Sequence, residues 1–200
     1  MLLLVSGATK NLHTFPNAGT LVVPGAWNKR RELPPRRWAM DNGAYSGFDE
    51  PKFRKMLALF QGVPGCLFVT APDVVGKAAE TLALWPQWRD EIRAAGYAPA
   101  LVAQDGLRPE QVPWAELGAL FIGGTTGWKM SAEVADLCRE AKARGVWLHM
   151  GRVNTRRRIR WAWQLGCDSV DGTGFSRWPG KRIPLYEHWL SSLRAQPDML

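Results

Sequence analysis

The sequence predicts a single compact α/β domain over residues 1–200, a (β/α)8 barrel of the TIM type. Three observations support this prediction. Eight short apolar segments alternate with stretches of helical periodicity, as in a chain of repeated β/α units. Several of those segments end in an aspartate that is followed by glycine or other loop residues. The length of 200 residues suits one domain, and a hydrophobic content of 46% is enough for a sizeable core.

The eight apolar segments are predicted to be strands because they are brief and bounded by glycine, proline or aspartate, as buried parallel strands are. They cover residues 2–6, 20–23, 38–41, 67–71, 100–104, 119–123, 146–150 and 168–171. The first segment has no basic residues before it, so the start of the chain predicts a strand and not a secretion signal.

Helical periodicity predicts five helices between and after these strands. In the first of them, Phe53, Met56 and Phe60 recur at helical spacing behind Pro51, a favourable residue for a first turn. Pro86 is expected to break or kink the second helix. The predicted helices cover residues 51–61, 77–95, 131–144, 155–165 and 184–194.

The net charge of +8, with a pI near 9.8, favours a polyanionic partner such as nucleic acid. The three cysteines are an odd number without C-x-x-C spacing, which argues against a disulfide framework and a cysteine-bound zinc, and favours a reducing cytoplasm. No apolar run approaches the roughly 20 residues that cross a membrane, so no membrane partner is expected.

The positive charge is concentrated in three clusters. The first lies in residues 7–37, which show no helical pattern and are expected to form a substrate-facing loop. The other two flank the segment of the last predicted strand. We expect the clusters to bind nucleic-acid phosphates, the alternative being a solvated surface with scattered acidic partners. They comprise Arg36 and Arg37, with Lys29, Arg30 and Arg31 beside them; Arg152, Arg156, Arg157, Arg158 and Arg160; and Arg177, Lys181 and Arg182.

Four aspartates, Asp41, Asp73, Asp105 and Asp171, stand at the ends of predicted strands. The carboxyl ends of the strands of a parallel barrel share one face, where active sites lie. Unpaired buried charges cost roughly several kcal/mol, so carboxylates that converge there predict acid/base or nucleophilic chemistry. Asp168 and Asp171 should point to opposite faces of a strand. We favour Asp171 for the barrel mouth because a glycine follows it.

Other residues near the strand ends complement a heterocyclic ligand. Tyr45 could hold a base by stacking, with Asp41 near its glycosidic bond; the alternative is an Asx turn with a packed tyrosine. Asp73 can accept two hydrogen bonds from a guanine-like edge, and Gln104 can both donate and accept.

Two further segments are weaker candidates. The pair Gly123-Gly124 lets backbone amides approach a ligand closely. Met150 offers a thioether to pack on a ring, the alternative being a core residue. His149 has no second histidine or cysteine close in sequence, so we expect an ordinary strand residue there and not a metal ligand.

In their order along residues 38–177, these motifs resemble those of the tRNA-guanine transglycosylase superfamily. Residues 41–45, Asp-Asn-Gly-Ala-Tyr, are similar to its Asp-Ser-Gly-Gly-Tyr/Phe motif, and residues 104–106, Gln-Asp-Gly, to its Gln-Gly-Gly segment. Residues 148–151, Leu-His-Met-Gly, are similar to its Leu-Met-Gly segment with one residue inserted or shifted. Residues 166–171, Gly-Cys-Asp-Ser-Val-Asp, are similar to its Gly-x-Asp-x-Phe-Asp nucleophile segment.

The resemblance implies a barrel that exchanges guanine in a polynucleotide for a 7-deazaguanine, with no metal or other cofactor. It implies that Asp171 is the nucleophile at the sugar C1′ and that Asp41 is the acid/base for the leaving or entering base. By the same resemblance the base is read at its edge and sandwiched between two side chains. The residues that contact the base edge would be Asp73, Gln104 and Gly124, the last of which lies in the turn that begins at Gly123. The two side chains that sandwich the base would be Tyr45 and Met150.

The departures from the family pattern narrow the expected substrate. Family members that act on tRNA carry a cysteine/histidine zinc site after the nucleophile segment, and here no cysteine follows Cys167. Asn42, Ala44 and Asp105 replace a serine and two glycines of the family motifs. A short, zinc-free form resembles the DNA-modifying branch of phages and bacterial modification islands. DNA is therefore the expected partner, with RNA the alternative, and a free 7-deazaguanine base, such as the 7-cyano or 7-aminomethyl form, is the second substrate.

Two other function classes stay open at this point. An N-glycosidase or nucleoside hydrolase would use the same residues but resolve the sugar intermediate with water. A non-catalytic nucleic-acid-binding barrel would keep the fold and the basic clusters without the chemistry. The sequence does not identify an accessory protein.

Overall fold

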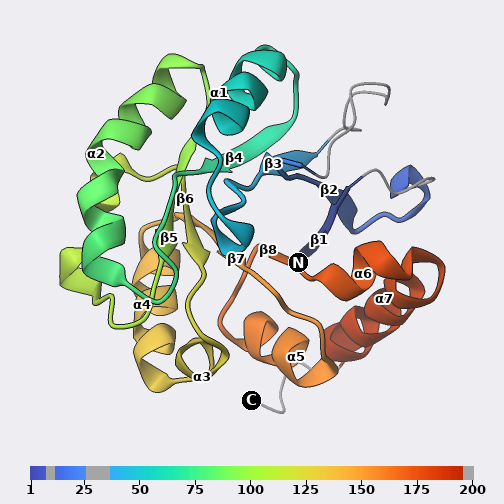
Figure 1. The fold of residues 1–200 in the computed structure, drawn as a ribbon. Helices are drawn as coiled ribbons and strands as arrows, with labels where there is room; N and C mark the ends of the chain where they lie inside the picture. The colour runs from blue at the N-terminus through green and yellow to red at the C-terminus, as the bar shows by residue number, and fades with distance from the viewer. Residues whose placement is uncertain (8–11, 26–36, 196–200) are drawn as a thin grey trace.

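The structure is a computed structural model that describes residues 1–7, 12–25 and 37–195. In this part of the chain, eight parallel strands close into a barrel in the order β1 to β8, and β8 is hydrogen-bonded back to β1. Helices surround the strands (Figure 1). The predicted (β/α)8 barrel is confirmed.

Each strand overlaps one of the predicted segments. The strands are β1 (Leu2–Ser6), β2 (Ala18–Val22), β3 (Trp38–Met40), β4 (Cys66–Thr70), β5 (Pro99–Ala103), β6 (Ala119–Ile122), β7 (Trp147–Met150) and β8 (Ser169–Asp171). β2 begins two residues before its predicted start because Ala18 already pairs with Leu3 of β1. That pairing is a tertiary contact, which the apolar pattern of the segment does not show.

Seven α-helices and four single-turn 3-10 helices connect the described strands. The α-helices are α1 (Glu50–Leu59), α2 (Ala78–Ala94), α3 (Thr126–Lys129), α4 (Ala132–Ala143), α5 (Arg156–Gln164), α6 (Thr173–Arg177) and α7 (Pro179–Ala195). The 3-10 helices are η1 (Leu12–Thr14), η2 (Ala44–Ser46), η3 (Pro109–Gln111) and η4 (Trp114–Glu116). Five of the α-helices were predicted; α3 and α6 are too short to show a period in the sequence.

The helix predicted over residues 77–95 is not broken at its proline. α2 continues through Pro86, with Trp85 and Trp88 buried on its inner face. An interior proline costs about 3 kcal/mol in a helix, and the burial of these two large side chains offsets it. α7 likewise contains Pro184 and begins five residues before its predicted start at residue 184.

Side-chain alternation along the strands gives the barrel two apolar layers. In β1, Leu2 and Leu4 point into the barrel, where they pack with residues such as Phe68 and Phe121. The alternate residues Leu3 and Val5 face the helices and join the larger core between barrel and helices. In some strands the same alternation turns a polar residue toward the mouth of the barrel at its carboxyl end, such as Thr70 of β4 and Asp171 of β8.

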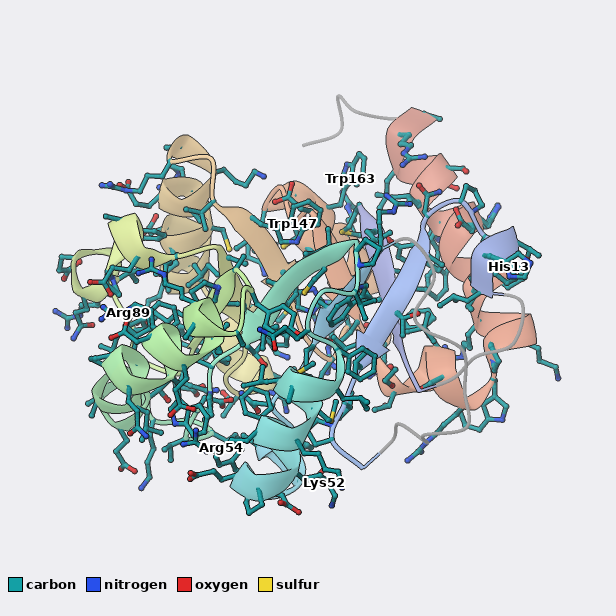
Figure 2. The ribbon with its side chains drawn as sticks, turned by 90° about the horizontal axis from the view of Figure 1, so that it is seen from above. His13, Lys52, Arg54, Arg89, Trp147 and Trp163 are labelled. Carbon is teal, nitrogen blue, oxygen red and sulfur yellow. The ribbon has the colours of Figure 1, made fainter. Side chains whose placement is uncertain are left out.

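Charged side chains lie on the outer side of the helices. Lys52 and Arg54 of α1 and Arg89 of α2 point away from the strands (Figure 2). Arg54 pairs with Glu91, and Arg89 with Glu116, which links neighbouring elements of the outer layer. Within the described residues, every helix is too short or too polar to span a bilayer.

Candidate active site

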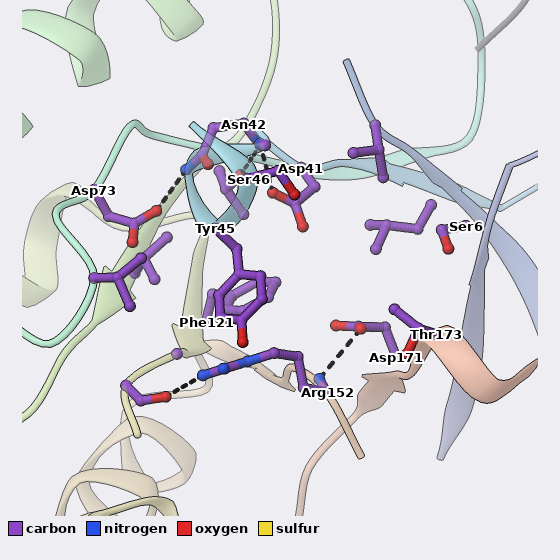
Figure 3. Close-up of a pocket in the computed structure, with 18 of the residues that line it drawn as sticks. Ser6, Asp41, Asn42, Tyr45, Ser46, Asp73, Phe121, Arg152, Asp171 and Thr173 are labelled. Atoms are coloured by element: carbon purple, nitrogen blue, oxygen red, sulfur yellow. Dashed lines mark hydrogen bonds between the residues drawn. The ribbon is translucent and has the colours of Figure 1, made fainter. Parts of the chain in front are cut away.

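A cavity of about 440 Å³ opens at the carboxyl ends of the strands. Its volume lies in the range of small-molecule binding sites. Asp41, Asp73 and Asp171 point toward one shared space from three sides of this cavity (Figure 3). Asp105, the fourth aspartate at a strand end, does not line it. Both of its carboxylate oxygens accept hydrogen bonds from Thr125, at 2.6 Å each, and so brace the loop after β6.

The predicted site residues are largely brought together. The cavity lining includes Asp41, Tyr45, Asp73, Gln104, Gly123, Gly124, Arg152, Arg158 and Asp171. The chain separates these residues widely, and the barrel gathers them because each lies at or just beyond the carboxyl end of its strand. The roles assigned to them stay predictions.

Asp41 begins a tight turn that shapes one wall of the cavity. Its Oδ1 accepts a 2.9 Å hydrogen bond from the N–H of Gly43, whose φ of 79° suits glycine. Asn42 Oδ1 accepts in the same way from the N–H of Ala44 at 2.7 Å. The Asx turn weighed as an alternative is therefore present. Tyr45 is not packed, however, since 69% of it is exposed at the cavity rim.

The pKa of Asp41 is raised from 3.8 to about 7. Burial is the main cause, and the negative charges of Asp171 and Asp73 add to it, while the bond from Gly43 opposes it. Near neutral pH both protonation states of Asp41 are populated. The group can therefore give and take a proton under ordinary conditions.

Asp73 is held by two side-chain amides. Asn42 Nδ2 donates to its Oδ1 at 2.8 Å, and Gln104 Nε2 donates to its Oδ2 at 2.6 Å. Burial raises the pKa of Asp73, and the two amide bonds work against that rise. The carboxylate is fixed in place, with lone pairs left for a ligand.

The side-chain amide of Gln104 is already hydrogen-bonded within the protein, which limits its bonds to a base. Its Oε1 accepts from the N–H groups of Gly76 at 2.8 Å and of Gly124 at 3.0 Å. The backbone amide of Gly123 donates to Ala103 O at 3.0 Å. Gly123 and Gly124 line the cavity as predicted, but neither amide is free to donate to a ligand because both are bonded to the protein.

The two glycines are needed for packing instead. A Cβ at Gly123 would lie 2.7 Å from Val102 Cγ1, and one at Gly124 would lie 2.4 Å from the Trp128 ring. Gly124 also has a φ of 63°. Glycine at these positions lets the loop after β6 lie flat against the cavity wall.

Asp171 faces the cavity at the end of β8, and Asp168 faces outward, as expected. Asp171 Oδ2 lies 3.0 Å from His149 Nε2, and its Oδ1 accepts a 3.2 Å bond from the Arg152 N–H. Asp168 accepts from Lys142 Nζ through both oxygens at 2.8 Å. The period-two geometry of the strand separates the two carboxylates.

Arg152 adopts a strained backbone beside Asp171. Its φ of 59° makes it the one non-glycine residue in the left-handed region among those that the structure describes. This conformation aims its N–H at Asp171. The guanidinium donates to Gly124 O and lies 4.5 Å from the centre of the Tyr45 ring, which closes one side of the cavity mouth (Figure 3).

Lys129 is a buried cation near the site that the sequence does not reveal. Its Nζ donates to Gly151 O at 2.7 Å, directly before Arg152. Burial lowers its pKa to about 7, and the positive charge of Arg152 contributes. Nothing in the local sequence marks this residue, because α3 is a single turn and the partner of Lys129 Nζ lies 22 residues further along the chain.

Met150 does not face the cavity. His149 points into the barrel, so the next residue of β7 points to the helices, where Met150 is 1% exposed in the outer core. The prediction that Met150 sandwiches a base is wrong. Phe121 and Val102 supply apolar lining inside the mouth, and Tyr45 supplies an aromatic face at the rim.

The second basic cluster reaches the cavity through Arg152 and Arg158, and the third lies on the helices that follow β8. Arg158 lines the cavity and donates to Arg152 O at 3.2 Å. The helix α6 starts directly after β8, and its Ser176 hydroxyl bonds the Ser6 hydroxyl of the cavity lining at 3.0 Å. The remaining cluster residues follow on α5, α6 and the start of α7: Arg156, Arg157, Arg160, Arg177 and Lys181, which are exposed, and Arg182, which is half-buried.

The first basic cluster does not contribute a described residue to the mouth. Arg37 directly precedes β3, which places it at the amino end of the barrel, and its guanidinium donates to Pro16 O at 2.8 Å. Its assignment to the nucleic-acid-binding face is therefore wrong. Arg36 and Lys29, Arg30 and Arg31 lie outside the described residues.

No group of three histidine, cysteine, aspartate or glutamate side chains among the described residues is arranged to hold a metal ion. Asp41, Asp73 and Asp171 are three carboxyl groups that line one cavity and have different surroundings. One is half-titrated near neutrality, one is held by amides, and one is held by an imidazole and a backbone N–H.

No protein-family model matches the chain, and no curated protein matches it in sequence. Among solved structures, the fold is similar to two crystal structures of tryptophan synthase from M. tuberculosis. The open form with BRD0059 bound shares 13% identity at a TM-score of 0.54, and the aminoacrylate- and BRD0059-bound form shares 11% at 0.56. Each comparison covers 97% of this chain and 91% of the other. At such low identity, the likeness extends to the fold alone.

Proposed function

We propose that the chain is an enzyme, a base-exchange glycosyltransferase that replaces guanine in DNA with a 7-deazaguanine through a covalent aspartyl-sugar intermediate. The observation that carries this proposal is the convergence of Asp41, Asp73 and Asp171 on one cavity of about 440 Å³. Three carboxylates at one small site are unfavourable for stability and useful for chemistry on a ligand that donates hydrogen bonds.

The polar surface of the cavity favours a ligand rich in N–H groups. Asn42 Nδ2 already donates to Ala71 O and to Asp73, and the Thr70 hydroxyl donates to Met40 O. Carboxylate lone pairs of Asp41, Asp73 and Asp171 are left for a ligand, and an ionised carboxylate only accepts hydrogen bonds. Guanine and its 7-deaza analogues present N–H donors on one edge, so they fit this surface better than a heterocycle that presents acceptors.

The different environments of the carboxylates divide the chemistry between them. Asp171 attacks the sugar C1′ and forms the ester bond, while the bond to N9 of guanine breaks. Asp41 gives its proton to the departing base and then takes the N9 proton of the incoming 7-deazaguanine. That base attacks C1′, and the ester bond to Asp171 breaks. Two displacements at one carbon retain the configuration of the sugar.

The basic cavity mouth supports a nucleic-acid substrate. C1′ of a stacked nucleotide is not accessible to a side chain inside a barrel, so the target nucleotide has to leave the stack. Arg152 and Arg158 line the cavity, and the exposed arginine and lysine side chains of α5, α6 and α7 are available to hold the flanking phosphates. The preference for DNA over RNA rests on the resemblance to the zinc-free DNA-modifying branch.

Base exchange is tested by incubating the protein with guanine-containing DNA and radiolabelled guanine or 7-deazaguanine at several salt concentrations. Incorporation of label into DNA, absent in an Asp171→Asn variant, supports the proposal. Label in RNA and not in DNA would move the substrate to RNA. Abasic sites without incorporated label would identify a glycosidase that uses water. Binding with neither product would identify a non-catalytic barrel.

A further inference from the structure

A chain of hydrogen bonds runs through the barrel interior and ends at Asp171. The indole Nε1 of Trp147 donates to Ser169 Oγ at 2.9 Å. Ser169 Oγ lies 2.8 Å from Nδ1 of His149, and Nε2 of His149 lies 3.0 Å from Asp171 Oδ2. All four residues point into the barrel from the adjacent strands β7 and β8.

The roles of donor and acceptor along this chain follow from Asp171. An ionised carboxylate has no hydrogen to give, so Nε2 of His149 is the donor to it. In the neutral ring Nδ1 is then an acceptor, and Ser169 supplies the hydrogen. The Ser169 hydroxyl can donate its hydrogen to Nδ1 while its oxygen accepts from the indole N–H of Trp147. The three upstream groups thus favour one tautomer of the imidazole.

The surroundings of His149 leave the ring little freedom to turn. Its exposed fraction is 0%, and it is packed against two phenyl rings. The centre of its ring lies 4.5 Å from that of Phe121 and 5.3 Å from that of Phe68. A rotation of the imidazole would leave a buried nitrogen without a partner, which is costly in an apolar environment.

The order of these groups excludes one familiar use of serine, histidine and aspartate. In a serine hydrolase the hydroxyl meets the substrate and the carboxylate lies behind the imidazole. Here the carboxylate of Asp171 lines the cavity, and Ser169 is fully buried behind His149. The reacting group at this site can only be the carboxylate.

We propose that His149 is a positioning residue that holds the Asp171 carboxylate turned for attack, and that Ser169 and Trp147 set the tautomer of the His149 ring. This inference rests on the proposed role of Asp171 as nucleophile. Asp41 and Asp73 share the cavity with Asp171, and the charges of Asp171 and Asp73 contribute to the raised pKa of Asp41. The N–H groups of His149 and Arg152 both point at the Asp171 carboxylate, so its two oxygens are held in place while one face stays open to the cavity.

The tautomer is measured by NMR of protein labelled with 15N-histidine, which does not depend on any activity. The chain has three histidines, and the His149 signal is the one that disappears in His149→Gln. We expect a protonated Nε2 and an unprotonated Nδ1 in the wild type, and a loss of this preference in Ser169→Ala. A protonated Nδ1 with a bare Nε2 in the wild type would overturn the proposal.

The kinetic arm compares His149→Leu with His149→Gln in the exchange assay. Loss of one hydrogen bond to a charged group predicts a fall in kcat of about 10- to 100-fold for leucine, with KM for the free base little changed. Glutamine keeps an N–H donor and should recover part of the loss. His188→Leu, on the exposed side of α7, is the matched control and should leave kcat unchanged.

Ser169→Ala covers the case in which His149→Leu does not fold. It keeps the imidazole and removes the hydroxyl that donates to Nδ1 and accepts from Trp147 Nε1, so a lower kcat in the folded variant supports the proposal. Wild-type kcat in both Ser169→Ala and a folded His149→Leu would overturn it. If the wild type exchanges no base, the proposed function fails, and the tautomer measurement still decides whether His149 donates to Asp171.

Discussion

Removal of the Asp41 charge should stabilise the protein while destroying its activity. In Asp41→Asn the side-chain oxygen can still accept from Gly43, so the turn is preserved. The wild-type group has a pKa of about 7 in the folded protein against an ordinary 3.8. The difference corresponds to about 4 kcal/mol once the group is ionised. Asp41 is half-buried and faces a cavity open to water, so this figure is an upper limit and about half of it is expected.

The sign of the pH dependence follows from the direction of the change. Between pH 3.8 and pH 7 the folded wild type binds more protons than the unfolded chain, so its stability falls as pH rises through that window. Asp41→Asn does not lose this contribution. The free energy of unfolding of the variant should therefore match that of the wild type near pH 4 and exceed it by about 2 kcal/mol at pH 8.

The assay is urea unfolding of both proteins across this pH range, with Asp136→Asn as the control. Asp136 is exposed on α4, so its substitution should shift stability little and without the same pH dependence. A stability difference between Asp41→Asn and the wild type that is constant with pH would refute the reasoning. So would a variant that is less stable than the wild type at pH 8.

Three further predictions concern the substrate. Asp171→Asn should lower base exchange by at least about 1000-fold and leave DNA binding unchanged in fluorescence anisotropy; loss of binding would mean that the carboxylate acts on structure. Asp73→Ala should raise KM for the free base by about tenfold or more in steady-state kinetics, because it removes an acceptor and leaves the amides of Asn42 and Gln104 unpaired. An effect on kcat alone would contradict this prediction. The double variant Arg156→Ala/Arg157→Ala should reduce the slope of a plot of log binding constant against log salt concentration by about two, whereas Arg139→Ala should leave that slope unchanged. Equal slopes in the two variants would argue against phosphate contacts on α5.

The sequence predicts the barrel and most of its mouth because both depend on local patterns. Short apolar segments with glycine, proline or aspartate at their ends mark all eight strands. In a parallel barrel the strand ends share one face, so Asp41, Asp73, Gln104 and Asp171 meet there without any knowledge of the contacts. The choice of Asp171 over Asp168 needs only the alternation of side chains along a strand.

The predictions for individual residues are wrong where the position of a side chain depends on strand register or on partners distant in the sequence. Met150 lies one residue from the inward-facing His149, and a shift of one residue moves a side chain to the opposite face. The amides of Gly123 and Gly124 are bonded to residues of the neighbouring strand and its following loop, which the motif does not show. Arg37 carries the expected charge at the wrong end of the barrel.

The residues that the sequence does not reveal are those whose importance comes from tertiary contacts alone. Asn42 donates to Asp73 from another strand end, and Lys129 supports the backbone before Arg152 from a single helical turn. His149 reads as an ordinary strand residue until β8 places Asp171 and Ser169 beside its two ring nitrogens. Polarity at an inward-facing strand position is the one sequence signal that could have drawn attention to it.

We propose that Asp171 drives exchange of guanine for a 7-deazaguanine in DNA. The most direct measurement is nucleoside mass spectrometry of DNA from cells that express the wild type or Asp171→Asn and are supplied with a 7-deazaguanine base. We predict a 7-deazaguanine deoxynucleoside with the wild type and none with the variant. An equal yield from both proteins, or unmodified DNA from both while the wild type binds DNA and remains folded, would contradict the claim.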